Sequence, residues 1–307
     1  MRKIKDVFPG SATPSETMIF SSRRRSENMT YTSMLVHVQD NKESDERIKL
    51  AGLVASRFNA KLIGIGCVPA IDTAARERVK PVFLGHDAAH SRPVLPWYGD
   101  EDLEPRFRSA AVSNRGDLEW KTSMQFPADA LYHESARADL LIVGQRGRSP
   151  VNQPHLALDP AEVVLRCGRP VLIVPPSLSQ LAADHVLVAW SNTREARRAV
   201  IDALPFLKEA SRVSIVEIVE EGGRDNAARR VDAVAEFLRL HDVETHAEVL
   251  ETIDGTVCET LLVHAEQQHA DLIVSGGYGH ARAREWMFGG VTRDLLHYSS
   301  KCCLLSH

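Results

Sequence analysis

Short apolar runs alternate along the chain with segments in which apolar residues recur at helical spacing. In the second half, the predicted strands are His185–Trp190, Val213–Val219, Val243–Leu250, Asp271–Ser275 and Cys302–Leu305. The predicted helices between them are Thr193–Ala210, Asn226–Leu240, Val257–Gln268 and a segment from about Val291 to His297. Short apolar strands that alternate with helices indicate a parallel sheet whose two faces are both covered.

The first half follows the same plan. Its predicted strands are Met34–Val38, Leu62–Cys67, Leu118–Ser123, Leu140–Val143 and Val171–Val174. The stretch 70–111 carries four prolines, so we expect it to be irregular, with at most short helices.

The two halves also resemble each other in sequence. Residues 138–147 (ADLLIVGQRG) align without gaps to residues 270–279 (ADLIVSGGYG), at an offset of 132 residues from 138 to 270. Met34–Val38 aligns with Val186–Trp190, at an offset of 152 residues from 34 to 186. We therefore predict a tandem duplication in which the first half has the longer middle segment.

These patterns divide the chain into four parts. Residues 1–30 are rich in serine and charge, lack the apolar core of a signal peptide, and are expected to form a disordered tail, with Met29 as an alternative start. Residues 31–176 are predicted to form one domain and residues 185–307 a second, joined by a linker at 177–184. The apolar strands Val171–Val174 and Cys302–Leu305 are expected to meet as an intramolecular pseudo-dimer, and a homodimer of chains is also expected.

Composition narrows the class of protein. The 307 residues are 44% hydrophobic and carry a net charge of −4, and no run of about 18 apolar residues is present, which excludes a membrane-embedded protein. The acidic balance argues against a dedicated nucleic-acid binder. Five cysteines without CxxC spacing favour a reducing compartment, so we expect a cytoplasmic protein.

The candidate ligand site is a glycine-rich loop after the strand Asp271–Ser275. Gly276 and Gly279 are followed after nine residues by Gly289, and Gly290 and Val291 open the next helix. Glycines let a backbone approach an anion closely, and a helix N-terminus favours negative charge. Ligands of open parallel sheets bind beyond the carboxyl ends of the strands, which is where this loop lies.

The loop therefore predicts phosphate binding, and three side chains inside it could add phosphate contacts: His280, Arg282 and Arg284. The alternative is a tight turn kept for packing, with the arginines facing solvent or a partner subunit.

The pattern Gly-x-x-Gly, nine residues, Gly resembles the loop of the universal stress protein family, and the resemblance covers residues 33–307. It implies two Rossmann-like domains, each a five-stranded parallel sheet flanked by helices, and an adenine nucleotide such as ATP or AMP, with Mg²⁺, as ligand. By this resemblance Gly276, Gly279 and Gly289, with the backbone of Gly290 and Val291, hold the phosphates.

Two positions depart from the family's pattern. Gly290 stands where a serine or threonine is usual, and Ser191 stands where an aspartate normally ends the first strand. Each lost hydrogen bond costs on the order of 0.5–1.5 kcal/mol, so the site is expected to be weakened but retained.

The first half departs further. Gly144 and Gly147 are kept, but Ala157 and Leu158 stand at the third glycine and after it, and Gln39 replaces the first-strand aspartate. We expect this half to have lost nucleotide binding.

Other chemistry is weakly supported. His86 and His90 have the i, i+4 spacing of a metal-binding helix, but a third ligand is missing and prolines lie nearby. No catalytic residue and no metal site is predicted. The sequence favours a non-enzymatic regulator or signalling module with an unknown protein partner. The alternatives are a nucleotide-independent interaction scaffold and a weak ATPase or phosphotransfer enzyme.

Overall fold

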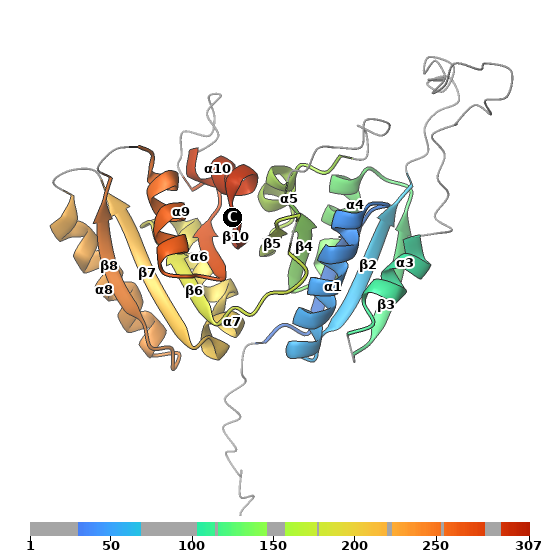
Figure 1. The fold of residues 1–307 in the computed structure, drawn as a ribbon, viewed down its shortest axis with the longest axis horizontal. Coiled ribbons are helices and arrows are strands. Elements are labelled where there is room, and N and C mark those ends of the chain that lie inside the picture. The colour runs from blue at the N-terminus through green and yellow to red at the C-terminus, as the bar shows by residue number, and fades with distance from the viewer. Residues whose placement is uncertain are drawn as a thin grey trace, which may run out of the picture.

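A computed structural model of the chain describes residues 30–68, 103–113, 116–145, 157–176, 178–219, 223–252, 255–279 and 290–307. In this part of the chain, ten strands form one continuous sheet in the order β3-β2-β1-β4-β5-β10-β9-β6-β7-β8. Figure 1 shows the two halves side by side, with helices on both faces of the sheet.

The first half contributes five strands, which confirm the predicted ones to within a residue: β1 (Ser33–Val38), β2 (Lys61–Cys67), β3 (Leu118–Ser123), β4 (Leu140–Gly144) and β5 (Val171–Val174). Its helices are α1 (Lys42–Arg57), α3 (Leu103–Ala110), α4 (Pro127–Glu134) followed by the 3-10 turn η2 (Ser135–Arg137), and α5 (Pro160–Arg166). The strands β1, β2, β3, β4 and β5 are parallel to one another.

The second half repeats the arrangement with β6 (His185–Ala189), β7 (Arg212–Val219), β8 (His246–Glu251), β9 (Leu272–Gly276) and β10 (Cys302–Ser306). Its helices are α6 (Arg194–Asp202), α7 (Leu204–Glu209), α8 (Arg224–Arg239), α9 (Val257–Gln267) and α10 (Gly290–Tyr298).

Two of the sequence predictions for this half are wrong in detail. The single helix predicted over Thr193–Ala210 is two helices that meet at Ala203, because Pro205 lacks an amide hydrogen and opens α7. The strand predicted from Val243 begins only at His246. The amide of Val243 instead donates to Leu238 O, in a turn where Asp242 adopts a φ of 63°.

The two halves join through their last strands, and the prediction that these strands meet is confirmed. β5 and β10 pair antiparallel, with Cys303 opposite Ile173 and Leu305 opposite Val171. All the other strand pairs in the described sheet are parallel. The two parallel sheets thus form one sheet, and neither of these apolar strands is left as an open edge.

Alternate strand residues face two separate cores. Leu172 and Leu304 belong to the core beneath α1, α3, α6, α7 and α8, whereas Ile173 and Cys303 belong to the core beneath α4, α5, α9 and α10. Because side chains alternate along a strand, one four-residue strand can supply both cores. Each core runs through both halves.

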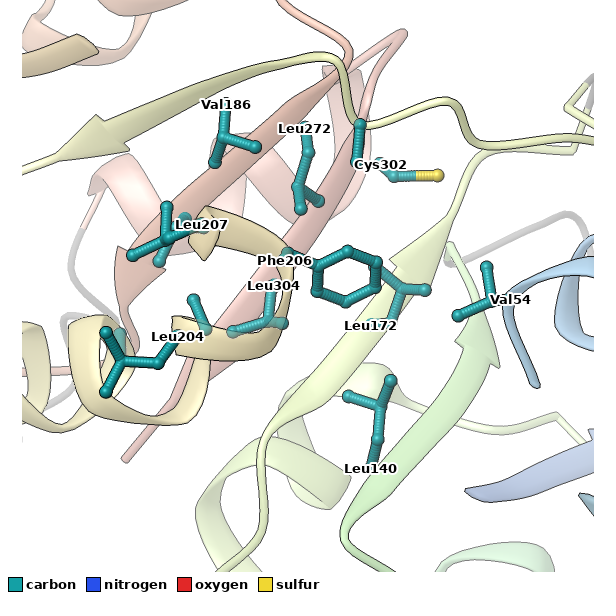
Figure 2. Packing of buried hydrophobic residues seen from close by; sticks show 14 of the residues in the cluster. Val54, Leu140, Leu172, Val186, Leu204, Phe206, Leu207, Leu272, Cys302 and Leu304 are labelled. Atoms are coloured by element: carbon teal, nitrogen blue, oxygen red, sulfur yellow. The ribbon is translucent and has the colours of Figure 1, made fainter. Parts of the chain in front are cut away.

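An aromatic cluster packs the halves together on the first face. Figure 2 shows Phe206 of α7 with Leu172 of β5 and Leu304 of β10 in the same buried cluster. The ring of Phe58 on α1 meets Phe206 edge-on at 5.1 Å and Tyr31 at 5.2 Å between centroids. Tyr31 Oη donates to Asp202 O at 2.6 Å, so the cluster joins residues more than 170 positions apart.

Candidate functional site

The order of the strands places the candidate site. From β6 the chain continues to β7 and β8 on one side, whereas β9 and β10 lie on the other side of β6. Ala189, the last residue of β6, pairs with Ser275 of β9. Ser191 and the loop that begins at Gly276 therefore leave the sheet at the same edge, where the strand order reverses. Open parallel sheets bind ligands at such a point.

Gly276 is required by the packing of α6. A Cβ atom at this position would lie 2.5 Å from Ala196 N and 2.8 Å from the carbonyl carbon of Glu195. Both of these atoms are backbone in the first turn of α6, so they cannot rotate out of the way. The close approach of strand and helix alone explains this glycine.

Gly279 faces two polar side chains from the same turn. A Cβ atom here would lie 2.7 Å from Glu195 Oε2 and 2.8 Å from Thr193 Oγ1. Thr193 is the N-cap of α6 and accepts a hydrogen bond from Ala196 N at 3.2 Å. Glu195 is only 3% exposed, and its carboxylate accepts a hydrogen bond from Arg194. A carboxylate and a hydroxyl thus lie against the glycine loop.

The contacts of Glu195 keep its carboxyl group ionised. Burial works to raise the pKa of this carboxyl, but the hydrogen bond from Arg194 and further polar contacts outweigh it, and the pKa lies below its usual value. Glu195 is therefore ionised at neutral pH. The sequence analysis missed Thr193 and Glu195, although a threonine before a helical pattern was a visible N-cap signal.

Between the two glycines, the loop is fixed by neighbours from both halves. Tyr278 adopts the left-handed conformation, with a φ of 59°, and its amide donates to Thr292 Oγ1 of α10 at 3.2 Å. A Cβ atom at Gly277 would meet Val164 of α5 at 2.8 Å, and His307 Nδ1 contacts Gly277 O at 3.0 Å. The backbone of the loop thus packs against the first half.

The ring of Tyr278 is buried as well. Burial, with the negative charge of Asp159 nearby, raises the pKa of Tyr278 to about 12. The phenol is therefore neutral at physiological pH.

The helix that follows the loop starts with an open position. Gly290 is the first residue of α10 and is exposed, and a Cβ atom built on it would meet none of the described residues within 4 Å. Val291 follows it and packs partly against the second core. The other predicted site residues, namely Gly289, His280, Arg282 and Arg284, lie outside the described residues.

In the first half, Gly144 aligns with Gly276, and an arginine side chain lies beside it in place of helix backbone. Arg47 of α1 is 4% exposed and donates from Nε and Nη2 to His37 O at 3.1 and 3.0 Å. A Cβ atom at Gly144, the residue that ends β4, would lie 2.5 Å from Arg47 Nη1. A buried guanidinium therefore fills the edge between β1 and β4. The alignment of the halves puts Ala199 opposite Arg47, so the second half has no such side chain there.

The candidate metal histidines His86 and His90 also lie outside the described residues. Within the described ranges, no three histidine, cysteine, aspartate or glutamate side chains gather as metal ligands would. None of the helices in these ranges is both long and apolar enough to cross a bilayer. All five cysteines are buried.

Comparison with known proteins finds a family resemblance in the second half of the chain. The sequence model of the Universal stress protein family matches residues 182–307. Universal stress protein Slr1230 of Synechocystis sp. (strain ATCC 27184 / PCC 6803 / Kazusa) is 23% identical over 181 residues, which is 57% of this chain. The match spans 60% of the length of that relative.

Solved structures share the fold along almost the whole chain. A universal stress protein from Archaeoglobus fulgidus DSM 4304 superposes with a TM-score of 0.65 at 17% identity, over 89% of this chain and 95% of that one. The functionally unknown protein PA1789 from Pseudomonas aeruginosa PAO1 gives a TM-score of 0.56 at 15% identity, over 90% and 92% of the two chains. Residues 182–307 are thus similar in sequence to the universal stress protein family, and almost the whole chain shares its fold with these solved structures.

Proposed function

We propose that the second half binds an adenine nucleotide, with Mg²⁺, at the edge of the sheet formed by Ser191, the loop from Gly276 to Gly279 and the start of α10. The position of Gly290 carries this proposal, because none of the described residues fills the space beside it at the first turn of a helix, where an anionic group would be favoured. The protein would act in the cytoplasm as a non-enzymatic regulator whose nucleotide state changes its affinity for a protein partner.

The charge of the site supports a magnesium complex over a free nucleotide. The ionised carboxylate of Glu195 lies against Gly279 and would repel a bare phosphate. Carboxylate and hydroxyl oxygens are ligands that Mg²⁺ accepts, and Glu195 and Thr193 present one of each. A bound Mg²⁺ would neutralise the charge between this carboxylate and the phosphates.

The packing of the loop supports a regulatory role. Gly277 lies against Val164 of the first half, and Gln145 Nε2 of the first half donates to Ser299 O at the end of α10, at 3.0 Å. A ligand that shifts the loop would therefore shift contacts between the halves. A ligand shifts an equilibrium between two conformations only if it binds them with different affinities. A loop that contacts both halves provides such a difference in affinity.

The first half would serve as a structural partner. The guanidinium of Arg47 occupies the edge between β1 and β4 and is held by backbone and amide oxygens. Photolabelling by an azido-ATP should accordingly map to the second half. Label found mainly in residues 144–158 would overturn this assignment.

The experiment exploits Gly290, where a new side chain meets open space. Gly290→Asp adds a carboxylate at the first residue of α10, which the helix dipole tolerates but a phosphate does not. Gly290→Asn has nearly the same shape without the charge. Thermal unfolding of the wild type with Mg-ATP at 100 times its dissociation constant should show about 2.7 kcal/mol of added stability. The asparagine variant should keep most of this gain and the aspartate variant should lose it.

The second candidate function is a nucleotide-independent interaction scaffold. It is favoured by the packing of Gly276 against Ala196 N, which explains a loop glycine without any ligand. The scaffold predicts no shift of the melting temperature with Mg-ATP in the wild type and no difference between the asparagine and aspartate variants.

A further inference from the structure

A cavity lies between α6 and α8. It has a volume of about 610 Å³, which is in the range of small-molecule sites. Its lining comes from the end of β6 and from the facing sides of the two helices: Trp190, Asn192, Arg197, Val200, Ile201, Asn226, Arg229, Arg230, Ala233, Val234 and Phe237.

The far end of this groove is apolar. Val200 and Ile201 in the last turns of α6 face Val234 and Phe237 of α8 across it. Ile201 is 42% exposed and Phe237 is half-buried, so apolar surface remains in contact with water. An apolar group bound between the helices would remove this surface from water.

The end nearest the strand edge is polar and cationic. Arg230 is neutralised, because its Nε donates to Glu217 Oε1 at 2.9 Å. Arg197 donates to the amide oxygen of Asn192 and Arg229 to that of Asn226. Neither Arg197 nor Arg229 makes an ion pair within the part of the chain that the structure describes. Two guanidinium groups without a carboxylate partner therefore border the groove.

One hydrogen-bond donor of a residue that lines the groove also lacks an acceptor among the described residues. Trp190 is 9% exposed, and its Nε1 is buried without an acceptor among the described residues. A buried N–H group without an acceptor costs about 1–3 kcal/mol, so few are found in folded proteins.

We propose that this groove binds a small amphipathic carboxylate, with the anionic group at Arg197 and Arg229 and an aliphatic or aromatic body between Ile201 and Phe237. The apolar walls favour a ligand with an aliphatic or aromatic body, and the two arginines favour an anion over a cation. From Asn226 to Phe237 the helix rises about 16 Å, which suits a medium-length chain such as decanoate. None of the loop residues from Gly276 to Gly279 lines the groove, so the proposed carboxylate site does not depend on nucleotide binding.

The test uses 8-anilinonaphthalene-1-sulfonate, an aromatic anion whose fluorescence rises in apolar surroundings. The folded full-length chain should bind the dye at a saturable site, and decanoate below its micellar concentration should displace it. Decyltrimethylammonium, with the same chain and the opposite charge, should not displace the dye. Mg-ATP should not displace it either, which separates this site from the nucleotide site.

Variants assign the binding to the groove. Arg229→Gln and Arg197→Gln should each weaken decanoate binding about tenfold, the scale of one charge-assisted hydrogen bond at a partly exposed site. Arg239→Gln, the same change in the last turn of α8, should have no effect because this residue does not line the groove. Ala233→Trp should abolish binding by filling the groove, and its far-UV circular dichroism melt shows whether the fold is kept.

Three results would overturn the proposal. They are the absence of saturable dye binding, decanoate affinity that is unchanged in both arginine variants, and displacement of the dye by Mg-ATP.

Discussion

Replacing Gly276 by alanine tests whether the approach of α6 to β9 explains the glycine loop. The added methyl carbon would lie 2.5 Å from Ala196 N and 2.8 Å from the carbonyl carbon of Glu195. A side chain in that position could rotate away, but these are backbone atoms of a helix. The first turn of α6, or the end of β9, must therefore move.

The magnitude follows from two opposing effects. Overpacking a well-packed site costs about 1–3 kcal/mol, and backbone obstruction puts Gly276→Ala toward the upper end. Alanine has fewer accessible backbone conformations than glycine in the unfolded chain, which stabilises the folded state by about 0.4–1 kcal/mol. The net destabilisation is then about 1–2 kcal/mol. At Gly290 a Cβ atom meets nothing, so Gly290→Ala should be more stable than the wild type by about 0.4–1 kcal/mol.

The two alanine variants form a matched pair, because each adds one methyl group to the same loop region. They should differ by about 1.4–3 kcal/mol in the free energy of unfolding. At roughly 2 °C per kcal/mol for a chain of this size, their melting temperatures should lie about 3–6 °C apart by calorimetry. Equal melting temperatures would refute the assignment of Gly276 to helix packing, as would a larger loss at Gly290.

Three further predictions concern the site and the buried groups. Gly290→Ser should tighten Mg-ATP binding by up to about tenfold in calorimetric titration, because it adds one hydroxyl in open space, and Gly290→Ala should not. Burial and nearby Arg47 lower the pKa of His37 to about 3. The unfolded chain takes up this proton below about pH 6.5, so the stability of the wild type should fall between pH 6.5 and 4.5 in urea titrations. The free energy of unfolding of the His37→Gln variant should fall by about 1–3 kcal/mol less than that of the wild type over this window. Burial also raises the pKa of the thiols of Cys167, Cys258 and Cys303 to about 11, 12 and 12, so these thiols should react with 5,5′-dithiobis(2-nitrobenzoate) only after unfolding.

Most of the strands can be predicted from the sequence because they are short apolar runs buried on both faces. Leu118–Ser123 and Val171–Val174 were predicted to the residue, although Leu118–Ser123 lies at the edge of the sheet and is only half-buried. The errors fall where a local signal competes with a periodic one. Apolar spacing continues through Pro205 and through Val243, but a proline and a left-handed Asp242 end the regular structure there.

The sequence similarity of the two halves, the strand–helix alternation and the positions of the loop glycines follow from the sequence alone, because each depends only on the order of residue types along the chain. The tertiary structure decided what each glycine faces. Gly276 meets Ala196 N and Gly144 meets Arg47, across 80 and 97 positions of sequence. The groove between α6 and α8 is likewise a product of helix placement. Such contacts depend on the order and register of the strands and on how closely each helix packs, and no local periodicity encodes them.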